Sequence, residues 1–134
     1  YKNFSAYKLF MLDVGLLGAV SELDAESILD GNDIFVEFKG ALTEQYVLQQ
    51  IVSDTPYTPF YYGTEKATFE QDFIIQKGKM IVPIEVKAEG NLKSQSLKAF
   101  CDKYHPDAAV RISAMKYINQ GWMENIPLYA VCNL

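Results

Sequence analysis

The sequence predicts an α/β domain built on a mixed β-sheet. Apolar residues recur at helical spacing over residues 34–52, which indicates one long helix. From residue 60 to residue 88 apolar and polar residues alternate around a glycine-containing turn, a pattern typical of antiparallel strands. Residues 93–113 then fit a helix followed by a strand. Because neither a repeat nor a linker divides the 134 residues, we expect a single domain over residues 1–134.

The N-terminal region is expected to contain a strand and a short helix. Residues 6–12 are apolar and rich in β-forming residues, which predicts a buried strand. Residues 13–20 follow as a short helix with Asp13 as its N-cap. Residues 21–33 are acidic and turn-prone, so we expect a loop between this helix and the next.

The long helix of residues 34–52 is expected to begin after Asp33, with Glu37 in the first turn favoured by the helix dipole. Gly40 costs about 1 kcal/mol relative to Ala inside a helix, so we expect another element to pack closely there. Glu44 lies at the margin of the apolar stripe and is expected to reach toward the sheet. The stripe itself is predicted to consist of Ile34, Phe38, Ala41, Leu48 and Val52.

The rest of the chain is expected to alternate between strands and one further helix. After a Pro-containing turn at residues 53–59, the predicted elements are strands at 60–62, 68–76 and 80–88 with a hairpin turn at 77–79, a helix at 93–104, a strand at 108–113 and an apolar segment at 126–132. The last segment fits either a strand or a short helix.

Three charged residues are predicted to share one face of the hairpin. Strand alternation places Glu85 and Lys87 side by side, and the hairpin turn brings Asp72 to the same face. Charges in apolar surroundings need partners or a metal, and carboxylates are the ligands that Mg²⁺ uses beside phosphate substrates. A neighbouring lysine can orient the attacking water and stabilise charge on a phosphate. The alternative is an exposed face on which Asp72 pairs with Lys87 and Glu44 is solvated.

Composition excludes several classes of protein. An apolar fraction of 49% excludes a disordered chain, and two cysteines exclude a disulfide scaffold. The cysteines and the single histidine cannot supply the four ligands of a structural zinc site. Because no apolar run approaches the roughly 20 residues of a membrane span and no signal peptide is present, we expect a reduced, cytoplasmic protein without a membrane partner.

The net charge of −5 excludes a strong, nonspecific DNA binder but conceals an uneven distribution. Residues 1–76 hold four basic and twelve acidic residues, whereas residues 77–134 hold eight basic and five acidic ones. In the basic part, Lys93, Lys98 and Arg111 are expected to contact phosphates, with a solvated face as the alternative. DNA binding, where it occurs, should therefore be weak, local and assisted by a metal.

Glu44, Asp72, Glu85 and Lys87 match the PD-(D/E)XK nuclease signature in order and spacing, with Gln71 where the signature has Pro. Longer motifs resemble the C-terminal domain of unknown function that follows an AAA-type ATPase in many bacterial and archaeal proteins. These motifs begin with YKLFMLDVGL from Tyr7 and continue with FKGALTEQYVL from Phe38, DFIIQ from Asp72, PIEVKA from Pro83, LKSQSL from Leu92 and NIPLYA from Asn125.

This resemblance implies a restriction-endonuclease-like fold, a mixed sheet flanked by helices, with an ATPase domain upstream in the parent protein. The missing initiator Met agrees with an excised piece, and no Gly-rich phosphate-binding loop is present. By resemblance, Asp72, Glu85 and Glu44 are expected to hold Mg²⁺, or Mn²⁺ as a substitute, and Lys87 to be the catalytic lysine. We therefore expect a DNA-binding, metal-dependent nuclease, with a nuclease-fold module that no longer cleaves and binds DNA or protein as the alternative. The sequence predicts neither the substrate nor the oligomeric state.

Overall fold

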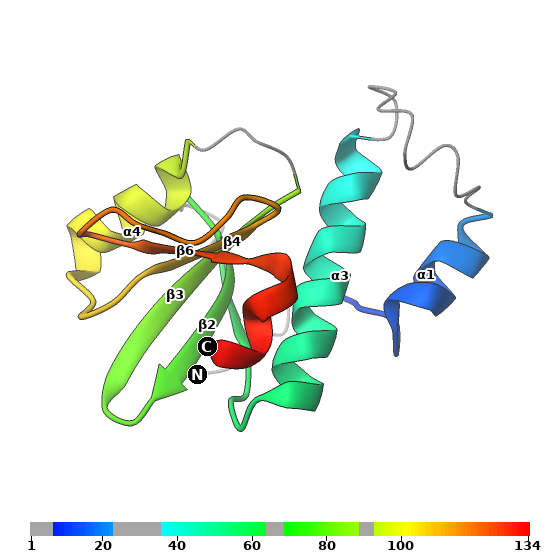
Figure 1. Ribbon diagram of the computed structural model, residues 1–134, viewed down its shortest axis with the longest axis horizontal. Helices are drawn as coiled ribbons and strands as arrows, with labels where there is room; N and C mark the ends of the chain where they lie inside the picture. The colour runs from blue at the N-terminus through cyan, green and yellow to red at the C-terminus, as the bar shows by residue number, and fades with distance from the viewer. Residues whose placement is uncertain (1–6, 23–35, 64–68, 89–92) are drawn as a thin grey trace.

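The computed structural model describes residues 7–22, 36–63, 69–88 and 93–134 (Figure 1). The elements in chain order are α1 (Val14–Val20), α3 (Val36–Asp54), β1 (Phe60–Tyr62), β2 (Gln71–Lys77), β3 (Met80–Lys87), α4 (Gln95–Tyr104), β4 (Val110–Ser113), β5 (Ile118–Asn119), β6 (Glu124–Pro127) and the 3₁₀ helix η2 (Leu128–Asn133). In this part of the chain, no helix combines the length and the hydropathy needed to cross a bilayer.

The strands form one mixed sheet in the order β1-β2-β3-β4-β6-β5, which confirms the predicted fold class. Strands β1, β2 and β3 are antiparallel to one another, β3, β4 and β6 are parallel, and β5 returns antiparallel to β6. The predicted hairpin is confirmed: Lys77 pairs with Met80, and Gly78 takes a positive φ of 64° that glycine adopts without steric cost.

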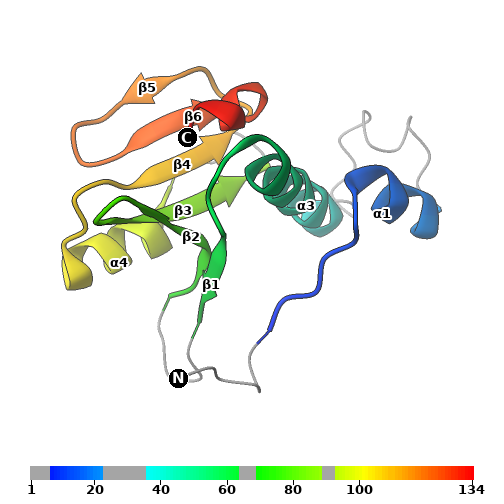
Figure 2. The same cartoon turned by 90° about the horizontal axis from the view of Figure 1, so that it is seen from below.

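Helices α3 and α4 lie on opposite faces of the sheet (Figures 1 and 2). Val47 and Ile51 of α3 join Phe73, Ile84 and Ile112 of the strands in the main apolar core. On the other face Leu97 of α4 packs with Ala109 and Met123 in a smaller cluster. Since both faces are covered, the central strands β3 and β4 are buried on both sides, as is usual for strands with parallel neighbours.

The predicted strand at residues 6–12 is wrong. Residues 7–13, called the N-terminal arm below, have no regular secondary structure before α1, and Leu9 and Leu12 are exposed. Two glutamine side chains of α3 bond the backbone here: Met11 N–H donates to Gln45, and Val14 N–H at the start of α1 donates to Gln49. The prediction of α1 is confirmed, with the Asp13 carboxylate accepting from Leu16 N–H at 2.7 Å.

The predicted long helix is present as α3, but its apolar stripe was wrongly placed. Val47 and Ile51 are fully buried, whereas Val52 is 62% exposed and Ala41 is also exposed. None of the described residues lies within 4 Å of a Cβ added at Gly40, so they provide no close packing of the kind expected there. Leu48 does pack against the core, as predicted. Ile34 and the expected cap Asp33 lie outside the described residues.

The C-terminal segment combines both structures that its sequence allowed. Its first two residues, 126 and 127, end strand β6, and the chain continues from Leu128 as η2. Proline lacks an amide donor, so Pro127 suits the end of a strand better than its interior. The short strand β5 was not predicted; its two residues pair with β6 at the edge of the sheet.

Candidate active site

The site lies at the end of the β2–β3 hairpin that is opposite the turn. Phe73 and Ile84 are the last pair of the β2–β3 ladder, and Asp72 and Glu85 are the next residues outward along the two strands. The Asp72 carboxylate accepts a hydrogen bond from Val86 N–H at 2.8 Å, which fixes this side chain against β3. The paired part of the hairpin ends at Phe73 and Ile84, so the sharing of one face by Asp72, Glu85 and Lys87 stays a prediction of the strand alternation.

Glu85 and Lys87 form the more buried ion pair of the site. Lys87 Nζ lies 2.9 Å from Glu85 Oε1, and the side chains are 33% and 5% exposed respectively. The second carboxylate oxygen, Oε2, is buried and has no hydrogen-bond partner among the residues that the structure describes. A carboxylate with one oxygen paired and the other left without a donor retains the capacity to accept a cation or a proton donor.

Glu44 and Asp72 are bridged by a lysine that the sequence analysis did not single out. Lys8 Nζ lies 2.9 Å from Glu44 Oε2 and 3.4 Å from Asp72 Oδ1, and all three side chains are largely buried. Burial raises the pKa of Glu44, as does the charge of Asp72, while Lys8 and Lys87 act in the opposite direction. Burial lowers the pKa of Lys8, but the two carboxylates outweigh it and raise this pKa overall.

The two ion-pair groups belong to one electrostatic site. The charge of Lys87 acts on the Glu44 carboxylate, so the two groups influence each other electrostatically. Lys8 links Glu44 to Asp72 of β2, so the Glu44 side chain lies against the sheet, as predicted. Lys8 was missed because it lies 36 residues from Glu44 and 64 from Asp72 in sequence, and no local pattern connects them.

The donor chemistry of the site fits a hard divalent cation. Glu44, Asp72 and Glu85 offer only carboxylate oxygens, which Mg²⁺ and Mn²⁺ prefer, and one oxygen of Glu85 receives no hydrogen bond from the part of the chain that the structure describes. Within the described ranges, however, no three Asp, Glu, His or Cys side chains gather closely enough to hold a metal ion. The Lys8 ammonium instead supplies positive charge between two of the carboxylates.

The expected phosphate contact of Arg111 is wrong. Arg111 is fully buried on β4, where it lies opposite Glu85 in the pairing of β4 with β3. Its Nε donates to Asn125 Oδ1 at 2.8 Å, and Nη1 lies 3.4 Å from Ser94 Oγ at the start of α4. Burial lowers the pKa of Arg111, and the charge of Glu85 partly offsets this. Arg111 therefore supports Glu85 from the interior and cannot meet DNA without leaving the core.

The other two predicted phosphate contacts lie on the surface. Lys93 is exposed just before α4, on the side where β3 ends. Lys98 is exposed on α4, forms an ion pair with Asp102 and lies 5.7 Å from the centre of the Trp122 ring. Both lysines remain accessible to a phosphate, and the ion pair of Lys98 is of the exposed kind that contributes little to stability.

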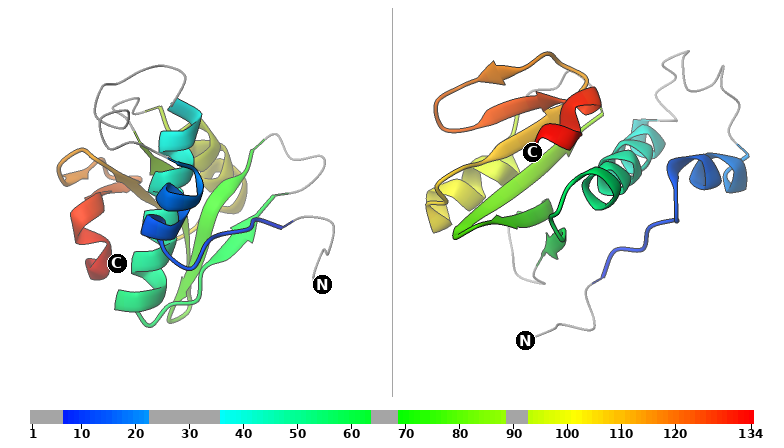
Figure 3. Two further views of the ribbon diagram at one scale, coloured as in Figure 1. Left: turned by 90° about the vertical axis from the view of Figure 1, so that its right-hand side faces the viewer. Right: turned by 60° about the horizontal axis from the view of Figure 1, so that its bottom comes forward.

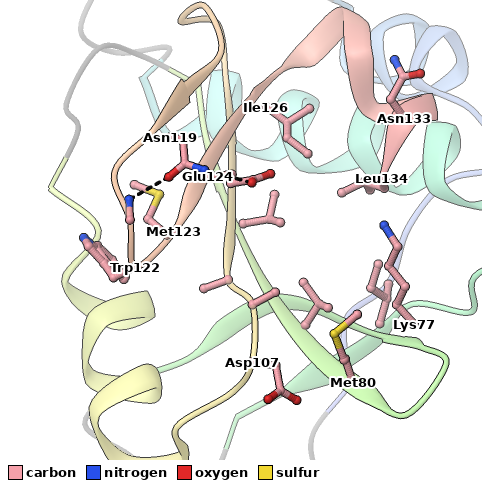
Figure 4. A pocket seen from close by; sticks show the side chains of 16 residues that line it. Lys77, Met80, Asp107, Asn119, Trp122, Met123, Glu124, Ile126, Asn133 and Leu134 are labelled. Atoms are coloured by element: carbon pink, nitrogen blue, oxygen red, sulfur yellow. Dashed lines mark hydrogen bonds between the residues drawn. The ribbon is translucent and has the colours of Figure 1, made fainter.

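A cavity of about 310 Å³ lies away from these charges, near the turn end of the hairpin (Figure 4). Its apolar lining comes from the sheet, including Ile75, Val82 and Ile126. At its rim Asn119 donates to Glu124 at 3.2 Å. None of the predicted catalytic residues lines this cavity, so the charged site and the cavity are separate features.

Residues 39–131 match the model of the family described as "Domain of unknown function (DUF4143)". The matched range contains Glu44, Asp72, Glu85 and Lys87 but not Lys8. No curated protein and no solved structure matches the chain.

Proposed function

The chain belongs to the DUF4143 family of domains of unknown function, and we propose that it is a metal-dependent nuclease that hydrolyses DNA phosphodiesters. The observation that carries the proposal is the buried carboxylate of Glu85, which pairs through one oxygen with Lys87 and whose other oxygen has no hydrogen-bond partner among the described residues. The resemblance to the PD-(D/E)XK signature supports the same assignment. We further propose that an AAA-type ATPase precedes this domain in its parent protein and that both act in the cytoplasm.

Each residue of the site has a distinct role in this proposal. Asp72 and Glu85, assisted by Glu44, would hold Mg²⁺ or Mn²⁺, which supplies Lewis-acid stabilisation of charge on the phosphate. Lys87 orients the attacking water and stabilises charge on the phosphate, because Glu85 holds its ammonium in place. Arg111, opposite Glu85 on the neighbouring strand β4, places a buried positive charge near this carboxylate. Lys93 and Lys98 would contact phosphates of the DNA backbone.

Plasmid cleavage tests the proposal. Supercoiled plasmid is incubated with the protein in EDTA, Mg²⁺, Mn²⁺ or Ca²⁺, and nicked product is measured on agarose gels. We expect nicking with Mg²⁺ and Mn²⁺ only, and a loss of at least about 100-fold in Lys87→Ala. Lys79→Ala is the matched control, since this exposed lysine lies in the hairpin turn, at the other end of the same strands. Absence of nicking under all conditions, or nicking that survives Lys87→Ala, would show that the site is not catalytic.

A second function is favoured by a specific observation: Lys8 bridges two of the three proposed ligands, and the described residues contain no preformed three-ligand group. These features suit a nuclease-fold module that binds DNA or protein without cleaving. Gel-shift measurements in EDTA separate the two functions. A binding module retains its DNA affinity without metal and loses it in a Lys93→Ala/Lys98→Ala double variant, whereas a nuclease requires the divalent ion for its activity.

A further inference from the structure

The N-terminal arm is held on α3 by specific contacts beside the site (Figure 3). Met11 and Gln45 exchange two hydrogen bonds, from Met11 N–H to Gln45 Oε1 at 2.8 Å and from Gln45 Nε2 to Met11 O at 3.0 Å. The Phe10 ring packs against Phe73 of β2, with 5.9 Å between the ring centres. These contacts fix the arm at Met11 and carry Lys8 to the carboxylates.

The Lys8 ammonium occupies a position where positive charge is needed. Glu44 and Asp72 repel each other, and Lys8 Nζ contacts an oxygen of each. The ammonium also lies 5.1 Å from the centre of the Tyr61 ring, a distance at which the ring face attracts a cation. The lysine therefore performs for these two carboxylates the neutralising role that a bound cation would perform.

We propose that Lys8 is an internal competitor of the divalent cation, so that metal binding at Glu44 and Asp72 displaces Lys8 from the site. This inference rests on the proposed metal-dependent function. The ammonium and the metal would use the same carboxylate oxygens, and their like charges repel at the short distances of a shared site. Because Phe10 packs against Phe73 and Met11 is held by Gln45, the displacement involves residues 7–9 and leaves the rest of the arm on α3.

Competition is reciprocal by thermodynamic linkage. If the Lys8 ion pairs lower the affinity of the site for the metal, bound metal must weaken the Lys8 ion pairs by the same free energy. Isothermal titration of the EDTA-stripped protein with MnCl₂ measures the first effect. We expect Lys8→Met to bind Mn²⁺ at least about fivefold more tightly than the wild type. Lys8→Arg keeps the charge and should retain an affinity near that of the wild type. Lys79→Met removes one positive charge far from the site and should likewise change little.

Limited trypsin digestion of the wild type measures the reciprocal effect and does not depend on the folding of a variant. Mn²⁺ should accelerate cleavage after Lys8, followed by mass spectrometry, but should not accelerate cleavage after Lys79. Measurable but equal Mn²⁺ affinity in the wild type and Lys8→Met overturns this inference and leaves the proposed function standing. Absence of Mn²⁺ binding in both proteins overturns the two together.

Discussion

The coupling between Glu85 and Lys87 gives the sharpest test of how the site is held. The perturbation is a double-mutant cycle with Glu85→Gln, Lys87→Met and the double variant, which isolates the energy of the pair from other effects of each change. We expect Lys87→Met to destabilise the protein, because it removes the ion-pair partner of Glu85 Oε1. The buried Glu85 carboxylate would then lack its lysine, while Oε2 already has no hydrogen-bond partner among the described residues. In the double variant, the loss should be smaller than the sum of the two single losses.

The size of the coupling follows from distance and burial. At 2.9 Å two unit charges attract by about 6 kcal/mol at an effective dielectric constant of about 20, and by about 1.4 kcal/mol in bulk water. The Glu85 side chain is 5% exposed but that of Lys87 is 33% exposed, so the attraction between the two charges lies between these two energies. Desolvation and side-chain ordering offset part of the attraction, and we therefore expect a coupling energy of about 1–3 kcal/mol.

Urea denaturation followed by far-UV circular dichroism measures each free energy of unfolding. The matched control is the same cycle on Lys98 and Asp102, a pair of the same charges whose side chains are 53% and 61% exposed. Its coupling should be about 0.3–0.5 kcal/mol and should vanish in about 1 M NaCl, whereas the buried pair should retain most of its coupling. A Glu85–Lys87 coupling no larger than that of the surface pair would refute the argument that Glu85 fixes the Lys87 ammonium.

Two further predictions concern packing and reactivity. Val47→Ala should cost about 2 kcal/mol of unfolding free energy, because Val47 is fully buried between α3 and the sheet. Val52→Ala, on the exposed side of the same helix, should change it by no more than about 0.5 kcal/mol, and urea denaturation compares the two variants. Burial, together with the charge of Asp102, raises the pKa of the Cys101 thiol above that of an ordinary cysteine, so the reactive thiolate forms only at higher pH. In a variant without the second cysteine, the rate of iodoacetamide alkylation should therefore have its midpoint at a higher pH than that of an exposed thiol, and Asp102→Asn should move that midpoint down.

The hairpin face was predictable because strand alternation has a period of two residues and the turn fixes the register. Once Gly78 is assigned to the turn, the register from Lys77–Met80 to Phe73–Ile84 follows, and the alternation predicts Asp72 and Glu85 as the next residues outward. The helix was predicted with less detail, since apolar residues lie on both sides of α3. The sequence alone does not decide whether Val47 or Val52 faces the sheet, and the tertiary packing selects Val47.

The errors at the arm and at β4 have different physical origins. The apolar composition of the arm suggested a strand, but a strand needs a neighbouring strand for its backbone groups. The side-chain amides of Gln45 and Gln49 instead accept hydrogen bonds from backbone N–H groups of Met11 and Val14. The spacing of apolar residues does not predict such side-chain contacts. Arg111 was assigned to the surface because it is basic. Its apolar neighbours on both sides are in fact typical of a central strand covered on both faces, so a signal for burial was present.

The charges of the site explain why Lys8 is the group expected to move. In the described part of the molecule, the carboxylates of Glu44, Asp72 and Glu85 are balanced by Lys8, Lys87 and Arg111. A divalent cation added to this set would bring excess positive charge into a largely buried region, so one of the three cations must withdraw. Arg111 is bonded within the core and Lys87 is fixed on a central strand, whereas Lys8 is carried by an irregular arm whose next anchor residue is Phe10. The lysine with the least rigid backbone support is thus the one that a metal ion can displace at the lowest cost.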